Sequence, residues 1–306
     1  MATPLRVGAL LEADKSFTET VAQLQRLADA GMAHAFLSQI FDHDALTMLA
    51  AAGAQVPGIA LGTGVVPVYP RHPMVLAQQA LSVQSATGNR LVLGIGLSHQ
   101  VVVENIWGYS YERPARYMKE YLASLLPLLR GEVVQSSGEM VSTHAFLPIG
   151  IPDVEPPMVV VAALAPTMLK LAGTVADGTI TWMTGIETVE SHIAPSIHAA
   201  AEAAGRPAPR VMVSLPVAVT ADPEGATERI NAALAIYPNL PSYKAMLDKE
   251  GAQSPADVSF IGDEETVAAS IQRLAAAGAT DFVAANAGSG EEQARTLALL
   301  SELARA

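Results

Sequence analysis

The feature that most constrains the fold is a repeated alternation of short apolar runs with longer helix-forming segments. Eight such units follow one another along the chain, and their apolar runs are continuous, as in parallel strands covered on both faces. The predicted strands span residues 5–11, 33–39, 59–68, 90–97, 157–164, 178–184, 210–220 and 280–287. The predicted helices span residues 16–31, 44–53, 73–88, 116–131, 166–176, 189–204, 264–277 and 291–304.

Eight strand–helix units in 306 residues predict an α/β fold of the (β/α)8 TIM-barrel type. No linker divides the chain, so residues 1–306 are predicted to form a single domain. A doubly wound open sheet with a second domain is the alternative, but the short loops of the first four units favour the barrel. A long insert at residues 226–258 follows the seventh strand, where it could form a lid, a substrate wall or a dimer contact.

Charge and composition exclude several classes of partner. The net charge is −12 and no basic stripe is present, so no nucleic-acid partner is expected. The chain has no cysteine, which excludes disulfides, thiolate metal sites and cysteine nucleophiles. No apolar run reaches membrane-spanning length and the N-terminus lacks a signal-peptide pattern, so we expect no membrane association and a cytoplasmic location.

The active site of a barrel lies at the C-terminal ends of its strands, and these ends carry few reactive side chains here. Glu12 is the one clear carboxylate, which argues against a glycosidase. The seven histidines are scattered, so no metal is expected. The stretch "GLSHQ" lacks the second glycine of a nucleophile elbow. This profile is typical of an enzyme whose cofactor carries the chemistry.

The fourth predicted strand ends in "LGIGLSH", a Gly-x-Gly sequence that resembles a dinucleotide-binding loop. A Rossmann fingerprint would need a third glycine where His99 stands, and a helix starting at once after the first strand. The motif therefore fails on residue, register and context. Gly94 and Gly96 either keep side chains away from a flat ligand or merely permit close packing.

Five segments in order resemble the luciferase-like (bacterial luciferase-type) oxidoreductases, most of all their coenzyme F420-dependent branch. They are "GTGVVPVYPRHPMVLAQQA", "TGNRLVLGIGLSH", "YERPARYMKEYLASLLPLLRGE", "PPMVVVAALAPTMLKLAGTVADGTITWMTG" and "FIGDEETVAASIQRLAAAGATDFVAAN". The resemblance implies a (β/α)8 barrel that binds an isoalloxazine-type ring over the strand ends. It also implies a homodimer and a small-molecule substrate.

Cofactor-binding residues are carried over from the matching positions. The resemblance implies a non-prolyl cis peptide bond at Gly64–Val65 and a phosphate cradle at "AALAP", with backbone N–H groups at a helix N-terminus. The departure from the family at Leu164–Ala165, where many relatives have a glycine, affects the details of that cradle. The cofactor-binding residues expected in this way are Ser38, Gln39, Gly64, Val65, Val66, Gly96, Leu97, His99, Ala162, Ala163, Leu164 and Ala165.

The family's catalytic pair has no counterpart here. Relatives often place an Asp-His pair at the end of the second strand, where this chain has Ser38 and Gln39. His99 is then the candidate catalytic residue, and a structural hydrogen bond is its alternative role. Glu12, Trp182 and Tyr243 are candidates for the substrate pocket, and Tyr237 lies in the same insert as Tyr243.

Three hypotheses for function follow. The first is an F420-dependent oxidoreductase that transfers a hydride between the cofactor and an organic substrate. The second is an FMN-dependent monooxygenase of the same fold. The third is a cofactor-binding protein with little activity, which the missing Asp-His pair keeps open.

Overall fold

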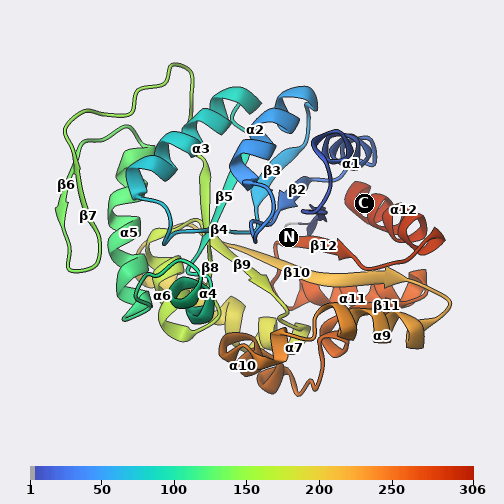
Figure 1. Ribbon diagram of the computed structural model, residues 1–306. Coiled ribbons are helices and arrows are strands. Elements are labelled where there is room, and N and C mark those ends of the chain that lie inside the picture. The colour runs from blue at the N-terminus through green and yellow to red at the C-terminus, as the bar shows by residue number, and fades with distance from the viewer. Residues whose placement is uncertain (1–3) are drawn as a thin grey trace.

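Eight parallel strands close into a barrel in the computed structural model of the chain, which describes residues 4–306 (Figure 1). In order around the barrel they are β1 (Arg6–Leu11), β2 (His34–Leu37), β3 (Ala60–Thr63), β5 (Leu91–Gly96), β8 (Met158–Ala162), β9 (Gly178–Trp182), β10 (Arg210–Val219) and β12 (Asp281–Asn286). Strand β12 pairs with both β10 and β1, and the second pairing closes the ring. The predicted fold class is confirmed.

Helices follow the strands and cover the outside of the barrel (Figure 1). They are α1 (Phe17–Asp29), α2 (Ala45–Gln55), α3 (Pro73–Thr87), α5 (Pro114–Leu129), α6 (Pro166–Val175), α8 (Ala194–Ala203), α11 (Glu264–Ala276) and α12 (Glu291–Arg305). Helix α1 begins with a capping box, in which Ser16 and Glu19 each accept a hydrogen bond from the other's backbone N–H group. Helix α3 stops at Gly88, which takes the left-handed conformation at φ 65°.

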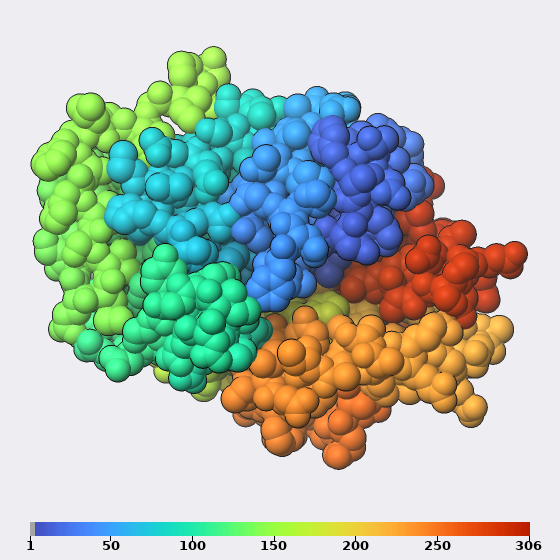
Figure 2. All heavy atoms as spheres, in the orientation of Figure 1, coloured from blue at the N-terminus to red at the C-terminus, as the bar shows by residue number. Residues whose placement is uncertain are grey.

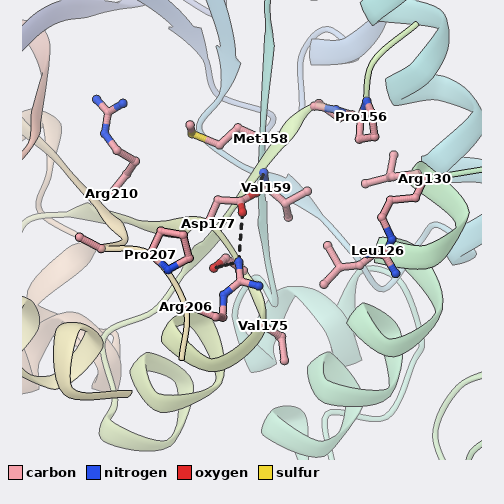
Figure 3. A pocket seen from close by; sticks show the side chains of 14 residues that line it. Leu126, Arg130, Pro156, Met158, Val159, Val175, Asp177, Arg206, Pro207 and Arg210 are labelled. Carbon is pink, nitrogen blue, oxygen red and sulfur yellow. Dashed lines mark hydrogen bonds and ion pairs between the residues drawn. The ribbon is translucent and has the colours of Figure 1, made fainter. Parts of the chain in front are cut away.

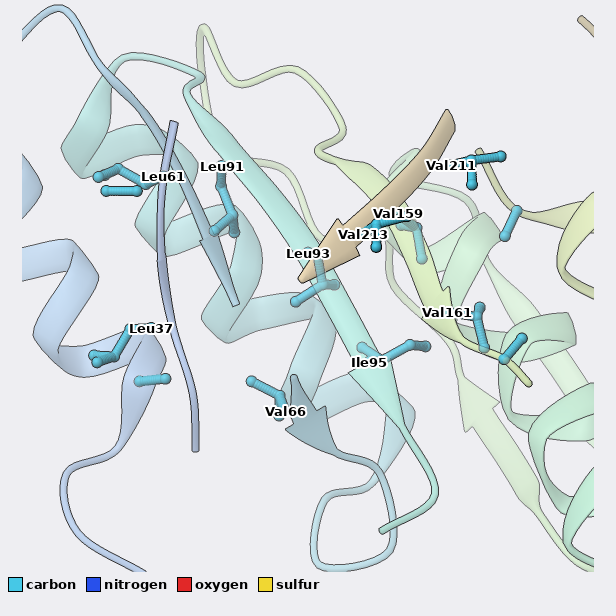
Figure 4. Close-up of a cluster of buried hydrophobic side chains, with 14 of the residues drawn as sticks. Leu37, Leu61, Val66, Leu91, Leu93, Ile95, Val159, Val161, Val211 and Val213 are labelled. Atoms are coloured by element: carbon cyan, nitrogen blue, oxygen red, sulfur yellow. The ribbon is translucent and has the colours of Figure 1, made fainter. Parts of the chain in front are cut away.

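The barrel strands are apolar on both faces because two separate layers of core pack against them. Phe36, Val92, Val160, Ile180 and their neighbours fill the barrel interior. The residues next to them along each strand point outward and pack under the helices. Figure 4 shows part of this outer layer, including Leu37, Leu93, Val161 and Val213. This two-sided burial explains why the strands are continuous apolar runs in the sequence.

Some elements differ from the prediction. The third predicted strand is interrupted at Gly64–Val65 and becomes β3 and a short β4 (Val66–Pro67). Strand β11 (Phe260–Gly262), which pairs with the end of β10, and the short helix α4 (Gln100–Asn105) were not predicted. Strands β6 (Val134–Ser137) and β7 (Ser142–Ala145) form an antiparallel hairpin beside α5.

The insert after β10 is mostly helical. It contains α9 (Pro223–Ala233), a 3₁₀ turn (Tyr237–Asn239), α10 (Pro241–Glu250) and a second 3₁₀ turn (Pro255–Val258). Figure 1 shows α10 beside α7 (Ile186–Thr188), which continues through a π-helical turn (Val189–Ile193) into α8. The insert therefore packs on the segment that follows β9.

The N-terminal ends of the barrel strands carry a hollow of about 510 Å³, which lies at the starts of β8, β9 and β10 (Figure 3). Three arginines line it, and each has a carboxylate partner. Arg206 lies 3.1 Å from Asp177, Arg130 lies 2.5 Å from Glu132, and Arg210 pairs with Asp281.

Among residues 4–306, no helix is both long and apolar enough to cross a membrane.

Candidate functional site

A bulge at the end of β3 is the most distinctive backbone feature at the C-terminal ends of the strands. The peptide bond Gly64–Val65 is cis, which confirms the expectation drawn from the resemblance. The hydroxyl of Ser38, at the end of β2, donates to the Gly64 carbonyl at 3.0 Å. On the other side, the buried Thr63 hydroxyl donates to the Gly94 carbonyl at 2.7 Å and accepts from the Gly94 N–H at 2.9 Å. The bulge is thus tied to both neighbouring strands.

Gly94 and Gly96 make room for this bulge. A Cβ atom on Gly94 would lie 1.9 Å from the Thr63 carbonyl oxygen, and one on Gly96 would lie 2.7 Å from Val65 Cγ2 and 3.3 Å from the Ala162 Cβ. Of the two roles weighed for these glycines, the structure shows close packing, because both are buried. Gly64, Val65 and Ala162 are half-buried beside Gly96, and we call these four residues the platform.

Helix α6 begins directly beyond the platform without a side-chain cap. Its N-cap residue is Ala165, which cannot accept a hydrogen bond from the first turn, and Pro166 follows. The backbone N–H groups of Thr167 and Met168 therefore remain available to an anion at a helix N-terminus. The preceding loop is held in place because the His192 ring lies at hydrogen-bonding distance, 2.8 Å, from the Leu164 carbonyl.

His99 stands at the end of β5, just after the platform. Ser98 before it has a φ of 60°, a left-handed conformation that turns the chain from the strand into α4. The imidazole is half-buried and gives no capping hydrogen bond to α4. Burial lowers the pKa of His99 below its usual 6.5, so the ring is neutral at physiological pH.

Three aromatic rings and His99 form a continuous chain across the site. The centroids of His99 and Tyr243 are 5.6 Å apart, those of Tyr243 and Tyr237 are 4.9 Å apart, and those of Tyr237 and Trp182 are 6.1 Å apart. Burial raises the pKa of both Tyr237 and Tyr243, so both phenols stay protonated. The chain of rings joins the end of β5, the insert and the end of β9.

Glu250, the last residue of α10, fixes the insert to the barrel. Its carboxylate accepts hydrogen bonds from the backbone N–H groups of Glu187 at 3.1 Å and Thr188 at 2.7 Å, in the first turn after β9. Gly185 leaves room for this arrangement, since a Cβ there would lie 2.2 Å from the carboxylate carbon and the Glu250 side chain would have to shift. The sequence did not point to Glu250, because a glutamate at the end of one helix gives no sign that it caps another.

Figure 2 shows a furrow, or surface groove, between the insert and the first three units. In Figure 2 the orange insert lies below the furrow, and the blue segments of the first three units lie above it. Atoms coloured yellow-green, from the middle of the chain, are visible at its floor. Within residues 4–306, no group of three or more His, Asp or Glu side chains is placed to hold a metal ion.

A model of the luciferase-like monooxygenase family matches residues 1–304 of the chain. The chain belongs to this family. Among curated relatives, the F420-dependent glucose-6-phosphate dehydrogenase of Nakamurella multipartita is 29% identical over 280 residues, which is 85% of this chain and 80% of the relative. The 5,10-methylenetetrahydromethanopterin reductase of Methanolobus tindarius is 27% identical over 222 residues, or 71% of this chain and 66% of the relative.

Solved structures of luciferase-like proteins share the fold of this chain. The coenzyme F420-dependent tetrahydromethanopterin reductase from Methanopyrus kandleri superposes with a TM-score of 0.83, at 21% identity and 98% coverage of both chains. The monooxygenase RslO1 from Streptomyces bottropensis superposes with a TM-score of 0.79, also at 21% identity, with coverage of 97% of this chain and 98% of RslO1. The matching family is one of monooxygenases and the two curated relatives are a dehydrogenase and a reductase, so this luciferase-like protein is an enzyme.

The other residues predicted to lie at the site differ in their burial and in their contacts. Gln39 is half-buried, and its side-chain oxygen accepts from the Ala45 N–H at the start of α2. Val66 is fully buried in the outer core, so only its backbone is left for a ligand. Leu97 is half-buried beside the platform, and Ala163 is buried under it. Glu12 is exposed in the first loop, where it pairs with Lys15 at 3.0 Å.

Proposed function

We propose that this protein is a coenzyme F420-dependent oxidoreductase that moves a hydride between the cofactor and an organic substrate. The observation that carries the proposal is the platform at Gly64–Val65, Gly96 and Ala162, which lies directly before the uncapped start of α6. A flat ring with an anionic tail fits such a pair of features. One curated relative is named an F420-dependent glucose-6-phosphate dehydrogenase, and a solved structure of the same fold is that of a coenzyme F420-dependent tetrahydromethanopterin reductase.

The residues that would hold the cofactor divide into two groups. The platform would lie against the ring through Gly64, Val65 and Ala162, which are half-buried, while Gly96 below them leaves room for Val65. The free N–H groups of Thr167 and Met168 would bind a phosphate of the tail without any basic side chain. When bound, the deazaflavin supplies or accepts a hydride at its C5 atom.

The protein's own part in the reaction is positioning and a proton. The platform and the aromatic chain would hold two reactants next to each other, which by itself contributes a large share of a rate enhancement. His99 is neutral and half-buried at the edge of the platform, so it can donate a hydrogen bond or relay a proton to the substrate. A homodimer, as the family resemblance implies, remains part of this proposal.

An FMN-dependent monooxygenase is the second candidate. It is supported by the monooxygenase RslO1, which superposes with a TM-score of 0.79. The platform alone does not discriminate between the two cofactors, since both carry a flat three-ring system. The difference lies in the reaction, because the monooxygenase requires oxygen and the hydride transfer does not.

Turnover with reduced cofactor tests the proposal. The purified protein is mixed anaerobically with reduced F420 and a panel of unsaturated and carbonyl compounds, and the return of the oxidised cofactor is followed by absorbance. A parallel set contains reduced FMN and oxygen. We expect substrate-dependent oxidation of F420 without oxygen. Product formation only with FMN and oxygen, and none with F420, would replace this proposal by the second candidate.

A further inference from the structure

The chain of rings has a composition that indicates what it binds. We call His99, Trp182, Tyr237 and Tyr243 the aromatic wall. Its members come from three separate elements, namely the end of β5, the end of β9 and the insert. Neighbouring ring centroids lie 4.9 to 6.1 Å apart, within the range of favourable aromatic pairs.

The backbone at both strand ends is shaped to present these rings. Ser98, directly before His99, has a φ of 60°, and Met183, directly after Trp182, has a φ of 55° and is fully buried. Left-handed backbone is uncommon for residues other than glycine and clusters at ligand sites. Two such residues beside two members of the wall indicate that the ring positions are specifically maintained.

Trp182 also provides a polar group without a partner. Its indole Nε1 is buried, and it makes no hydrogen bond of acceptable geometry within the part of the chain that the structure describes, although the Tyr237 phenol is near. A buried N–H donor without an acceptor is costly. An acceptor oxygen of a ligand, such as a carbonyl or amide oxygen, would satisfy it.

The charge at the wall is negative. Tyr243 and Glu250 are seven residues apart on α10, so they lie on the same face, about 10 Å apart along the helix. The Glu250 carboxylate occupies the N-terminus of the helical segment after β9, where an anionic group of a ligand would otherwise be stabilised. On the same helix Lys244 pairs with Asp248, whereas Lys249 is exposed and forms no ion pair within residues 4–306.

We propose that the aromatic wall binds the substrate, and that this substrate is a flat, uncharged aromatic compound with a hydrogen-bond acceptor oxygen. The rings would stack on its apolar body, and Trp182 Nε1 would donate to its oxygen. Phosphorylated and carboxylated compounds are disfavoured, because the Glu250 carboxylate already occupies the helix N-terminus after β9 that would otherwise stabilise their charge. The inference rests on the proposed function for the reaction, but the binding preference can be measured without any cofactor.

Three related probes separate the contributions of ring and charge. trans-Cinnamamide has the ring and a neutral acceptor oxygen, trans-cinnamate has the same shape with a negative charge, and crotonamide lacks the ring. Affinity is measured by isothermal titration calorimetry, with and without F420. We expect cinnamamide to bind at least about tenfold more tightly than either of the other probes, which corresponds to about 1.4 kcal/mol.

Two variants assign this preference to named residues. Glu250→Gln removes the charge and keeps one of the two acceptor oxygens, enough for the shorter hydrogen bond from the Thr188 N–H, so cinnamate should gain about tenfold relative to cinnamamide. Glu224→Gln makes the same charge change on the exposed first turn of α9 and should alter neither affinity. Tyr237→Leu should weaken cinnamamide about tenfold and leave crotonamide unaffected.

The outcomes distinguish this inference from the proposed function. Equal binding of cinnamate and cinnamamide, or an unchanged ratio in Glu250→Gln, would overturn the assignment of the wall. The oxidation of reduced F420 by cinnamamide is measured separately. If cinnamamide binds as expected while no compound of the panel oxidises F420, the proposed function fails and the assignment of the wall stands.

Discussion

Single residues determine the shape of the platform, and the structure defines the role of Gly96 most clearly. The sequence indicated that two glycines end the fourth barrel strand near a ligand. It did not indicate that Val65, thirty-one residues earlier, fills the space that a side chain at Gly96 would need. Contacts of this kind depend on the cis bulge and on strand register, which a local pattern does not contain.

Gly96→Ala tests the platform. Its Cβ would lie 2.7 Å from Val65 Cγ2, so Val65 must move across the surface that would carry the ring. We expect the affinity for F420 to fall about tenfold or more, and overpacking to lower the free energy of unfolding by about 1–3 kcal/mol. Gly150→Ala is the matched control, since a Cβ there meets nothing within 4 Å. Unchanged F420 affinity in Gly96→Ala would show that the platform is not where the ring binds.

His99 predicts a pH dependence of stability. Its pKa is lowered by burial in the folded protein, so below about pH 6.5 the unfolded chain binds more protons than the folded one. The free energy of unfolding therefore decreases as pH falls from the pKa of His99 in the unfolded chain towards its lower pKa in the folded protein. In urea unfolding at pH 7.5 and 5.5, the wild type should lose more stability than His99→Gln. Equal losses in both proteins would mean that His99 is not buried as described.

At the scale of elements, the sequence predicts well what depends on periodicity. The eight barrel strands and the helices between them follow from continuous apolar runs, glycine stops and caps such as Ser16 with Glu19. Strand β11 was not predicted, because three residues carry too little pattern, and it exists only by pairing with the end of β10. The helices of the insert and its anchor at Glu250 likewise depend on contacts with a distant segment.

Helix α6 provides the test at this scale. Ala165→Asp and Ala165→Asn both place a capping side chain at the uncapped N-terminus, so each should stabilise the protein by about 0.5–2 kcal/mol. Both compete with a bound anion for the first-turn N–H groups, and the aspartate also repels it. We expect the affinity for F420 to decrease in Ala165→Asn and to decrease more strongly in Ala165→Asp. A stabilised Ala165→Asp protein with unchanged affinity would place the cofactor's phosphate elsewhere.

For the whole molecule, closure of the barrel is supported by a buried charged cluster at the end opposite the site. Asp281 of β12 is fully buried, 3.2 Å from Arg6 of β1 and 3.3 Å from His34 of β2, and it pairs with Arg210 of β10. Burial alone would raise the pKa of Asp281, but these contacts hold it below its usual value. Sequence reasoning missed the cluster, because its members are spread over 275 residues of chain.

Asp281→Asn should destabilise the whole barrel. Hydrogen bonds to a charged group typically contribute about 1.5–3 kcal/mol, and the partly exposed Arg6 and Arg210 both lose their charged partner. The midpoint of urea unfolding should fall while the slope stays the same. Asp248→Asn, which breaks an exposed pair with Lys244, should change stability by less than about 1 kcal/mol. Equal effects of the two substitutions would contradict the structural role of the cluster.

The central claim is that the platform and the start of α6 together bind a deazaflavin, and an equilibrium titration tests it most directly. The purified protein is titrated with coenzyme F420 and, separately, with FMN, and the fluorescence of each cofactor is followed. We predict saturable binding of F420, weakened in Ala165→Asp. Tight binding of FMN with no binding of F420 would contradict the claim.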